Sequence, residues 1–377
     1  MNTPKLSILI PSYNSVAYIK ECIQSVIAQT LKDIEIICID ANSTDGTLEL
    51  LRMYEKQDTR IKVIISEHKS YGTQLNIGLR AAKGEYFGIV ESDDWIRKDM
   101  YEILYAKAKE YDCDAVKAGF CVVAYGNESK VEVLHPEYRY LYDQVLDPMY
   151  TPRPVMLGAN MLNQIGIYRL DLAMSNQIFL NTTAGASYQD NGLYFQLMSF
   201  SRRVMYIRDI LYYLRRDNPN SSVKSTEKVY CICEEYDFIR EFLARHKDIE
   251  KVMLPYYVMY RFANYEGTLF RIDPKYHAEF LERFAQDFIE LKTHGDLDEK
   301  MLGVTFCKKV EYLIINPNNY YHVFIKRDLR GKLLWCGFYL DKQLLLYKAK
   351  RAVMKLHKKF LDVRKVCRFW SLQIFKI

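Results

Sequence analysis

Apolar runs and amphipathic stretches alternate along the first 90 residues of the chain. Short apolar runs at 5–10, 34–39, 62–65 and 86–90 are typical of buried strands. Between them apolar residues recur every three or four positions, as on one face of a helix. The first helix carries this face at Val16, Ile19, Ile23, Val26 and Ile27, the second ends near residue 57, and the third spans about 73–82. Successive strand-helix-strand units predict a parallel sheet with right-handed crossovers.

Polar residues follow three of these strands. Residues 11–14 follow the first strand, Asp40 the second, and Glu91, Asp93 and Asp94 the last. The carboxyl ends of parallel strands meet at one edge of a sheet, where ligands bind. Three carboxylates within four residues repel one another, and a divalent cation such as Mg²⁺ or Mn²⁺ would offset that repulsion. A solvated acidic turn is the alternative. We also expect Asn14 or Ser15 to cap the first helix.

The turn after the first strand lacks the glycine motifs of the common nucleotide-binding folds. Neither Gly-x-Gly-x-x-Gly nor Gly-x-x-x-x-Gly-Lys-Ser/Thr occurs there, which argues against a dinucleotide enzyme and a P-loop ATPase. Residues 11–14 are also not the glycine-rich basic loop that a sugar-nucleotide pyrophosphorylase needs for a triphosphate.

Helical periodicity replaces the alternating pattern after residue 226. An apolar stripe begins there, and further helical runs lie near 254–270, 276–292 and 303–315. The stripe consists of Val229, Ile232, Tyr236, Ile239 and Leu243. We therefore predict a sheet domain over 1–226 and a helical subdomain over 227–341. The segment 127–160, rich in Tyr, Pro and Asp, is expected to be a loop-rich insertion that shapes one side of the site.

The basic residues concentrate in the last segment, 342–377. This segment holds eleven Lys or Arg and one Asp, so its net charge is +10. The whole chain has a net charge of +6, so the residues before the segment carry −4. Apolar residues recur there at helical spacing, a composition that is typical of a helix lying on an anionic membrane surface. Packing of the same stripe on the domain is an alternative. We expect no nucleic-acid partner, because the basic residues do not extend into the body of the protein.

Cysteine usage and hydropathy predict the compartment. The nine cysteines are odd in number, scattered and without a Cys-x-x-Cys pair, as in a protein with reduced thiols. The chain shows no signal peptide pattern and no apolar run of about 18 to 20 residues. We expect a cytoplasmic protein, peripheral on the inner face of the plasma membrane through its basic tail.

Several segments carry a family resemblance. They are Ser7 to Asn14, Asp40 with Ser43 to Thr47, Asn76 to Gly78, Ala82 to Tyr86, and Glu91 to Asp94. In order and spacing they resemble glycosyltransferase family 2, the inverting enzymes of GT-A fold. Ser187 to Asp190 and Tyr213 to Ser222 look like the transferases of bacterial capsule and O-antigen synthesis. The resemblance covers about 5–225 and implies an α/β, Rossmann-like, mostly parallel sheet flanked by helices.

The resemblance implies a binding site for the nucleotide. Pro11 and Tyr13 would line its pocket, and Asp40 would accept a hydrogen bond from the uracil ring, which presents an N–H where cytosine does not. Two positions depart from many relatives: Ala41 stands where a second Asp is common, and Leu75 where Arg is common. The full predicted nucleotide-sugar-binding set is Pro11, Tyr13, Asn14, Asp40, Ser43, Gly72, Asn76, Glu91, Ser92, Arg215 and Arg216.

The resemblance also implies the metal ligands and the base. Glu91-Ser92-Asp93 stands for the family's Asp-x-Asp, which makes Asp93 the expected ligand of Mn²⁺ or Mg²⁺, with Asp94 next. The cation would act as a Lewis acid on the departing diphosphate. Asp190 would deprotonate the acceptor hydroxyl. A plain helix N-cap is the alternative for Asp190, and a helix N-terminus would stabilise its ionised form.

Arg215 and Arg216 lie within the segment Tyr213 to Ser222 that carries the resemblance, and Lys224 follows it closely. These three residues are predicted to close over the diphosphate, with an exposed basic turn as the alternative. Together these residues predict a metal-dependent inverting hexosyl- or N-acetylhexosaminyl-transferase. It would move a sugar from a UDP-sugar to an oligosaccharide on a polyprenyl lipid, in cell-surface polysaccharide synthesis. The alternative is a non-catalytic relative that binds UDP-sugars at the membrane, which the departures at Ala41, Leu75 and Glu91 favour.

Overall fold

The computed structural model describes residues 3–221 and 225–328. The chain divides into two compact units, one made of 1–280 with 290–304 and the other of 281–289 with 305 onward. Helices α8 (Cys231–Arg245) and α9 (Lys247–Arg271) belong to the first unit together with the sheet, although they follow the predicted boundary at 226. The predicted basic tail, 342–377, and the predicted diphosphate contact Lys224 lie outside the described residues.

One mixed sheet forms the centre of the first unit. Its strand order is β3-β2-β1-β4-β9-β6-β10-β5, with β7 beside β6 and β8 beside β10. The strands are β1 (Leu6–Ser12), β2 (Ile34–Asp40), β3 (Ile61–Ile65), β4 (Tyr86–Ile89), β5 (Trp95–Ile96), β6 (Ala115–Ala124), β7 (Asn127–Val131), β8 (Val145–Leu146), β9 (Gly166–Arg169) and β10 (Val204–Arg215). Strands β1 to β4 are mutually parallel, as predicted, while β9 runs antiparallel between β4 and β6.

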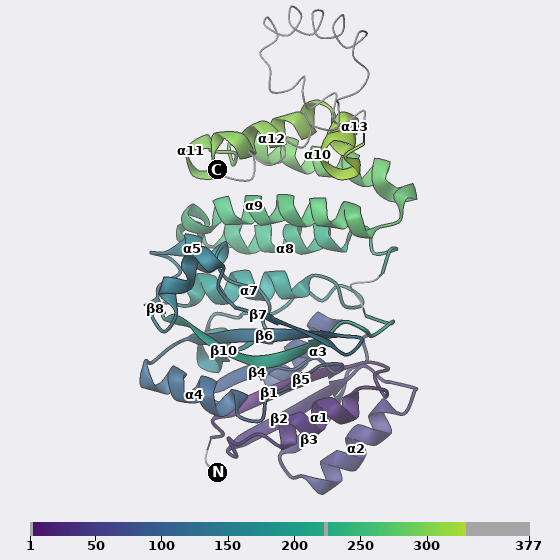
Figure 1. The fold of residues 1–377 in the computed structure, drawn as a ribbon, viewed down its shortest axis with the longest axis vertical. Coiled ribbons are helices and arrows are strands. Elements are labelled where there is room, and N and C mark those ends of the chain that lie inside the picture. Colours follow the sequence, from purple (N-terminus) through teal and green to yellow (C-terminus); the bar gives the residue numbers. More distant parts are fainter. Residues whose placement is uncertain (1–2, 222–224, 329–377) are drawn as a thin grey trace, which may run out of the picture. The chain divides into compact units, whose positions relative to one another are not determined.

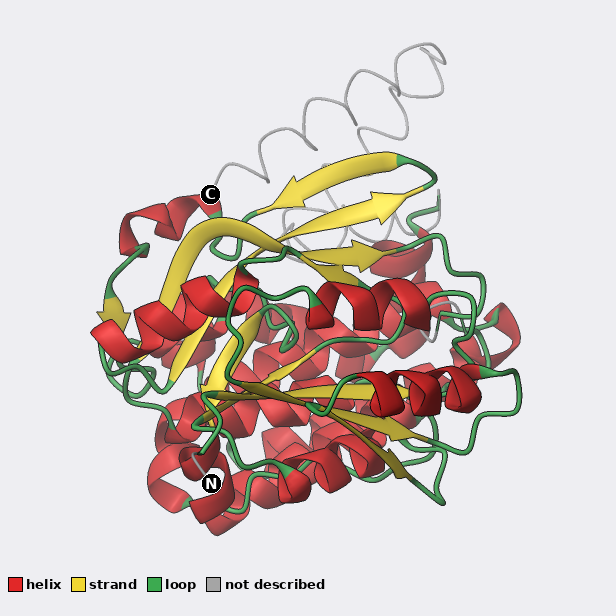
Figure 2. Cartoon of the chain, turned by 90° about the horizontal axis from the view of Figure 1, so that it is seen from below, coloured by secondary structure: helices red, strands yellow, loops and turns green. Residues whose placement is uncertain are grey.

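Helices flank this sheet (Figures 1 and 2). The predicted first three are α1 (Ile19–Ile27), α2 (Thr47–Gln57) and α3 (Tyr71–Ala81), and the others are α4 (Met100–Glu110), α5 (Pro152–Met156), α6 (Leu170–Ser175) and α7 (Gln189–Phe200). All seven residues of β1 are buried between β2 and β4, which explains its continuous apolar sequence. The mixed α/β fold predicted from the sequence is confirmed.

The start of α1 differs from the prediction. Tyr18 is its N-cap residue, and no side chain caps this end. Ser15 contributes its backbone carbonyl instead, which accepts hydrogen bonds from the N–H groups of Tyr18 and Ile19. The predicted side-chain cap by Asn14 or Ser15 is therefore wrong. The turn leaves Asn14 to bond elsewhere, at the edge of the sheet where the site lies.

The segment 127–160 contains short elements rather than continuous loop. Besides β7 and β8 it forms a 3₁₀ turn at Pro136–Leu141 and the helix α5. Helix α7 is buried over most of its surface and packs against α8. Figure 1 shows α7 between the sheet and α8. This burial fixes the position of the first turn of α7, which bears Asp190.

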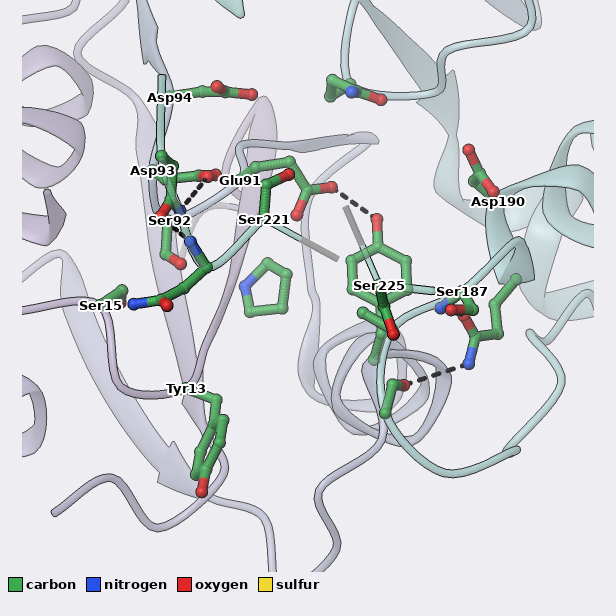
Figure 3. Close-up of a pocket in the computed structure, with 18 of the residues that line it drawn as sticks. Tyr13, Ser15, Glu91, Ser92, Asp93, Asp94, Ser187, Asp190, Ser221 and Ser225 are labelled. Carbon is green, nitrogen blue, oxygen red and sulfur yellow. Dashed lines mark hydrogen bonds between the residues drawn. The ribbon is translucent and has the colours of Figure 1, made fainter. Parts of the chain in front are cut away.

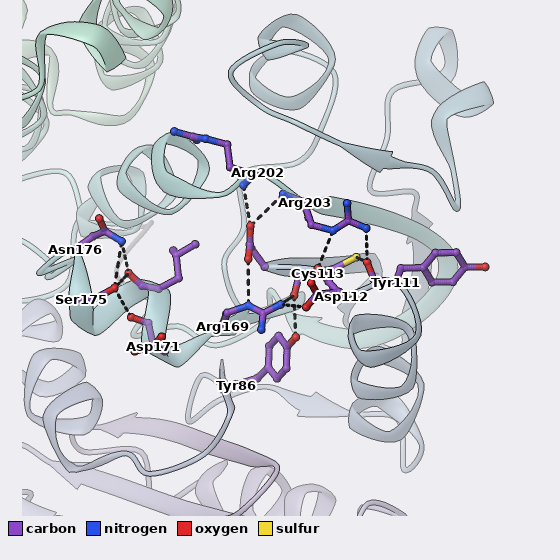
Figure 4. A network of polar contacts seen from close by, with 12 residues as sticks. Tyr86, Tyr111, Asp112, Cys113, Arg169, Asp171, Ser175, Asn176, Arg202 and Arg203 are labelled. Atoms are coloured by element: carbon purple, nitrogen blue, oxygen red, sulfur yellow. Dashed lines mark hydrogen bonds and ion pairs between the residues drawn. The ribbon is translucent and has the colours of Figure 1, made fainter.

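An ion-pair network holds the amino edge of the parallel strands (Figure 4). Arg169, at the end of β9, pairs with Asp112 (2.6 Å) and Asp114 (3.1 Å) in the turn before β6. Asp114 also accepts hydrogen bonds from the backbone N–H groups of Arg202 and Arg203, which precede β10 (2.8 and 3.1 Å). These contacts join three turns at one edge. The opposite, carboxyl edge stays available for the site.

The described part of the second unit, 281–289 and 305–328, is helical. It holds the middle of α10 (His277–Thr293), most of α12 (Val304–Ile315), α13 (Pro317–Tyr320) and a π-helical turn at Tyr321–Lys326. Phe284 packs against Phe288 and Tyr320 there. Helix α11 (Glu299–Leu302) belongs to the first unit. Across the described part of the chain, no helix combines the length and apolar character needed to traverse a lipid bilayer.

Candidate active site

A cavity of about 1370 Å³ opens at the carboxyl edge of the sheet. Its walls come from the turn after β1, the start of α3, the acidic turn after β4, the start of α7, the end of β10, and α9. The predicted site residues that line it are Pro11, Tyr13, Asn14, Glu91, Ser92, Asp93, Asp94, Asp190, Arg215 and Arg216. The sheet therefore brings together groups that are up to about two hundred residues apart, as its predicted topology requires.

Asp93 and Asp190 line this same cavity from two different walls (Figure 3). Asp93 lies in the turn that follows β4, and Asp190 lies in the first turn of α7. Glu91 lies between them in the view of Figure 3. The two carboxylates predicted to serve the metal and the base thus share one space.

The end of β10 is tied to the acidic turn. Asp94 is buried, and its oxygens accept hydrogen bonds from the Tyr212 hydroxyl (2.7 Å) and the backbone N–H of Arg215 (2.7 Å). Burial and the nearby Asp93 carboxylate raise the pKa of Asp94 to about 7. Arg215 also donates from Nε to the backbone carbonyl of Asp93 (2.8 Å). These bonds make Asp94 the anchor of the turn; its role as a second metal ligand stays a prediction.

Asp93 has an oxygen to offer a cation. Its Oδ2 accepts a hydrogen bond from Asn218 Nδ2 (2.8 Å), and no donor among residues 3–221 and 225–328 pairs with Oδ1. The described residues hold no group of three or more His, Cys, Asp or Glu side chains arranged around one metal position. Mg²⁺ and Mn²⁺ need no such group when phosphates and water complete their coordination. The donor set around Asp93 therefore fits a cation that binds together with a nucleotide diphosphate.

Glu91 is held by a residue that the sequence did not single out. The Tyr71 hydroxyl, at the start of α3, donates to Glu91 Oε1 (2.6 Å). Burial, and then the Asp94, Asp93 and Asp190 carboxylates, raise the pKa of Glu91 to about 8, while the bond from Tyr71 opposes this. Glu91 thus presents one bonded oxygen and one open oxygen to the cavity wall.

The backbone around Asp190 is fixed by side chains on both sides. Asn163 Nδ2 donates to the Asp190 carbonyl (2.8 Å), and Glu235 Oε1 on α8 accepts the N–H of Gly192 (2.7 Å). Burial raises the pKa of the Asp190 carboxyl, although the backbone N–H groups of Asp190 and Asn191 oppose this. The helix N-terminus stabilises the ionised form through these N–H groups, but burial has the larger effect, so the pKa is raised and not lowered as the helix position alone predicts. Asp190 is consequently a stronger base than an ordinary aspartate.

Four predicted binding residues do not line the cavity: Asp40, Ser43, Gly72 and Asn76. Asp40 is fully buried and accepts hydrogen bonds from the Ser12 hydroxyl and from the N–H and hydroxyl of Ser43 (2.7 to 2.9 Å). Both oxygens of Asp40 therefore have partners within the protein, and these bonds hold the turn after β1. The contact of Asp40 with uracil stays a prediction, because a carboxylate can accept more bonds than these.

The other residues away from the cavity also have partners within the protein. Ser43 Oγ accepts the backbone N–H of Asn14 (2.9 Å), which holds the turn that carries Tyr13. The amide of Asn76 pairs with both the N–H and the carbonyl of Leu180 (2.8 Å each). Both residues support the cavity walls, and their contacts with the donor stay predictions.

Gly72 is required by a close backbone approach. A Cβ at this position would lie 1.8 Å from the carbonyl oxygen of Asn181. We expect Gly72→Ala to lower the free energy of unfolding by about 3 kcal/mol because backbone has to move. Gly267→Ala, in α9 with no atom within 4 Å of its new Cβ, should instead raise it by about 0.7 kcal/mol. Urea unfolding of both variants measures this; equal and small effects would contradict the packing role of Gly72.

Comparison with known proteins supports the family. Residues 7–169 match the family model Glycosyl transferase family 2. These residues form a glycosyl transferase family 2 domain. Glycosyltransferase GlyG of Streptococcus pneumoniae is 40% identical over 112 residues, which are 29% of this chain and 37% of GlyG. Putative glycosyltransferase EpsH of Bacillus subtilis is 28% identical over 216 residues, 57% of this chain and 62% of EpsH. The chain thus spans about a third to three fifths of these two relatives.

The family 2 domain has the GT-A fold. The crystal structure of S. aureus TarS 1-349 in complex with UDP-GlcNAc superimposes with a TM-score of 0.66, covering 89% of this chain and 93% of that one, at 20% sequence identity. The likeness extends beyond the family match at residue 169. The shared fold is therefore not confined to the segment that matches the family model.

Several cavity residues were not predicted from the sequence. Besides Tyr71 they include Lys69, which donates to the Tyr13 hydroxyl (2.7 Å) and lies over its ring, and Asn218, which bonds to Asp93. Asn218 falls inside the segment 213–222 that carried the resemblance, so the sequence contained that signal. Lys228 and Arg271 lie after this segment, where periodicity indicated only helices.

Proposed function

We propose that this protein is a metal-dependent, inverting glycosyltransferase that moves a hexosyl or N-acetylhexosaminyl group from a UDP-sugar to a cell-surface oligosaccharide. The observation that carries the proposal is that Asp93 and Asp190 line one cavity in a family 2 domain of GT-A fold. Residues from the matched segment and from α7 contribute to the same walls. TarS, which shares the fold, forms a crystalline complex with UDP-GlcNAc, and this makes UDP-GlcNAc the first donor to test.

The chain's own residues divide the chemistry between two walls. Asp93 would hold Mn²⁺ or Mg²⁺, which when bound supplies positive charge to the leaving diphosphate. Asn218 and Arg215 keep the Asp93 turn in place. On the other wall, Asp190 would accept the proton of the acceptor hydroxyl as that oxygen attacks the anomeric carbon from the face opposite the diphosphate, which inverts the configuration.

Arg215 and Arg216 complete the donor side in this proposal. Arg215 is committed to Glu21, Asp217 and the Asp93 carbonyl, so it positions the acidic turn. Arg216 lines the cavity, and its charge opposes the rise in the pKa of Asp94. We therefore assign the diphosphate contact to Arg216 rather than to both arginines.

The direct test is release of UDP from a panel of UDP-sugars, with Mn²⁺, with and without lipid-linked or soluble oligosaccharide acceptors. Mass spectrometry of the product identifies the transferred sugar, and the anomeric configuration of the new bond tests inversion. A protein that binds UDP-sugars without releasing UDP, with any acceptor, would be the non-catalytic alternative. That outcome would refute the enzymatic proposal and keep the cavity as a binding site.

The raised pKa of Asp190 predicts a pH dependence. The base must be ionised, so kcat/KM should fall as the pH drops through the raised pKa of this carboxyl. The acid limb should have its midpoint above the ordinary range of an aspartate, about 3.9. Its position should not depend on Mn²⁺ once the metal saturates, because Asp190 is not a proposed ligand. A midpoint that moves with the Mn²⁺ concentration would assign the limb to the acidic turn instead.

We also keep the proposal of a polyprenyl-linked acceptor and of a membrane-binding tail. The tail's charge of +10 suits the inner, anionic leaflet, where such an acceptor would be presented. Full-length protein should sediment with vesicles of anionic phospholipid, and a variant ending near residue 341 should not. Equal sedimentation of the two proteins would remove the tail as the anchor.

A further inference from the structure

Four cationic side chains line the cavity without a carboxylate partner in the described part of the chain: Lys69, Arg216, Lys228 and Arg271. Two of them lie together, Lys228, before α8, and Arg271, the last residue of α9. Lys228 Nζ donates to the carbonyl of Ala186 (2.7 Å), and Arg271 Nη2 donates to the carbonyl of Lys228 (2.8 Å). Among the described residues, neither side chain forms an ion pair with an Asp or Glu. Both positive charges therefore face the cavity uncompensated.

The two charges also affect each other. Burial lowers the pKa of the Lys228 ammonium, and the positive charge of Arg271 lowers it further. Arg271 Nε is buried, and no acceptor in the described part of the chain pairs with it. Arg215, in the same cavity, is instead neutralised by Glu21 and Asp217. Placing like charges together in a partly buried site is unfavourable, and a bound anion offsets this.

Both cations are attached to the loop that leads into Asp190. Lys228 holds the carbonyl of Ala186, and the guanidinium of Arg271 lies 4.8 Å from the centre of the Tyr188 ring. Tyr188 is the N-cap residue of α7, two positions before Asp190, and adopts φ +66°. Asp93 and its partners Asn218 and Arg215 form the other wall. The cation pair thus belongs to the wall that the acceptor hydroxyl approaches.

We propose that Lys228 and Arg271 form a subsite for an anionic group, a phosphate or a carboxylate, carried by the acceptor. This inference rests on the proposed function, since it takes Asp190 to mark the acceptor side. Guanidinium and ammonium groups bind such oxyanions through charge-assisted hydrogen bonds. The donor's own diphosphate offers the same chemistry, so the experiment must separate the two sources.

The test compares neutral and anionic sugars on the full chain with saturating UDP and Mn²⁺. The probes are methyl glucoside, methyl glucoside 6-phosphate and methyl glucuronide, with dissociation constants from titration calorimetry or ligand-observed NMR. We expect the anionic probes to bind about tenfold more tightly than the neutral one. In Lys228→Gln, Arg271→Gln and the double variant this preference should shrink to about twofold, while the affinity for UDP is unchanged.

Matched variants separate charge from folding. Lys251 is an exposed residue of α9, the helix that ends at Arg271, and it does not line the cavity. Lys251→Gln should keep the full preference for anionic probes. Lys228→Arg and Arg271→Lys preserve the positive charge and should retain most of the preference for anionic probes. A loss of this preference that is seen only in the Gln variants is therefore electrostatic. If a Gln variant does not fold, the affinities of the wild-type protein and of the charge-preserving variants for neutral and anionic probes still test the inference.

Two outcomes would overturn the inference. Equal affinities of the wild-type protein for neutral and anionic probes would mean that no acceptor anion binds there. Weaker binding of UDP in the Gln variants, with the probe preference intact, would assign the cations to the donor diphosphate. Both readouts are binding measurements, so they remain informative if the protein releases no UDP and the proposed catalytic function fails.

Discussion

We expect Asp190→Asn to lower the kcat for sugar transfer by about 10³-fold and to leave the dissociation constant of UDP unchanged. The amide has nearly the shape of the carboxylate and accepts no proton at neutral pH. Asp190 lies in the first turn of a buried helix whose backbone is held by Asn163 and Glu235, so the substitution should not move the loop. UDP release under steady-state conditions gives kcat, and calorimetry gives the UDP affinity.

The control for this variant is Asp171→Asn. Asp171 is an exposed carboxylate in the first turn of another helix, α6, and does not line the cavity. Its replacement should change kcat by less than about twofold. If Asp190→Asn retained near-normal turnover, Asp190 would be a helix-terminal residue and the base would lie elsewhere. A loss of UDP binding in the same variant would instead indicate a collapsed cavity.

Asp93→Asn is expected to have the second largest effect, about 10²- to 10³-fold on kcat/KM, because a bound cation supplies several kcal/mol to a developing diphosphate charge. The Asn oxygen can still accept the hydrogen bond from Asn218, so the turn should keep its shape. The variant should need much more Mn²⁺ for half-maximal activity. EDTA should abolish the activity of the wild-type protein, and added Mn²⁺ should restore it.

A nearby carboxylate serves as the control. Asp217 lies in the segment after β10 and contacts Arg215 Nη1 at 3.7 Å, but it does not line the cavity. Asp217→Asn should change the Mn²⁺ dependence by less than about twofold. If Asp93→Asn kept the Mn²⁺ dependence of the wild-type protein, Asp93 would not be the ligand. Activity of the wild-type protein in EDTA would remove the metal from the proposal altogether.

The sequence alone determined the first four strands of the sheet and its functional edge. The apolar runs that became β1, β2 and β4 are buried on both faces, and the four predicted strands lie within two residues of the observed ones. The helices between them carry equally clear stripes. Since parallel strands end at one edge, the convergence of residues 11–14 with the acidic turn followed from connectivity. The division into compact units could not be predicted from periodicity. Helices α8 and α9 belong to the unit of the sheet because they pack on α7, through contacts between residues far apart in sequence.

The tertiary structure decided which polar residues reach the cavity. Asp40 follows β2 as predicted, but Ser12 and Ser43 enclose it, and no local pattern reports such partners. Tyr71, at the start of α3, donates a hydrogen bond to Glu91 after β4. Lys228 and Arg271 contact the loop before Asp190, although their own sequence contains no recognisable motif. Periodicity and motifs record contacts among neighbours in the chain. The partner of a polar side chain, and hence its charge state and role, depends on which distant elements pack beside it.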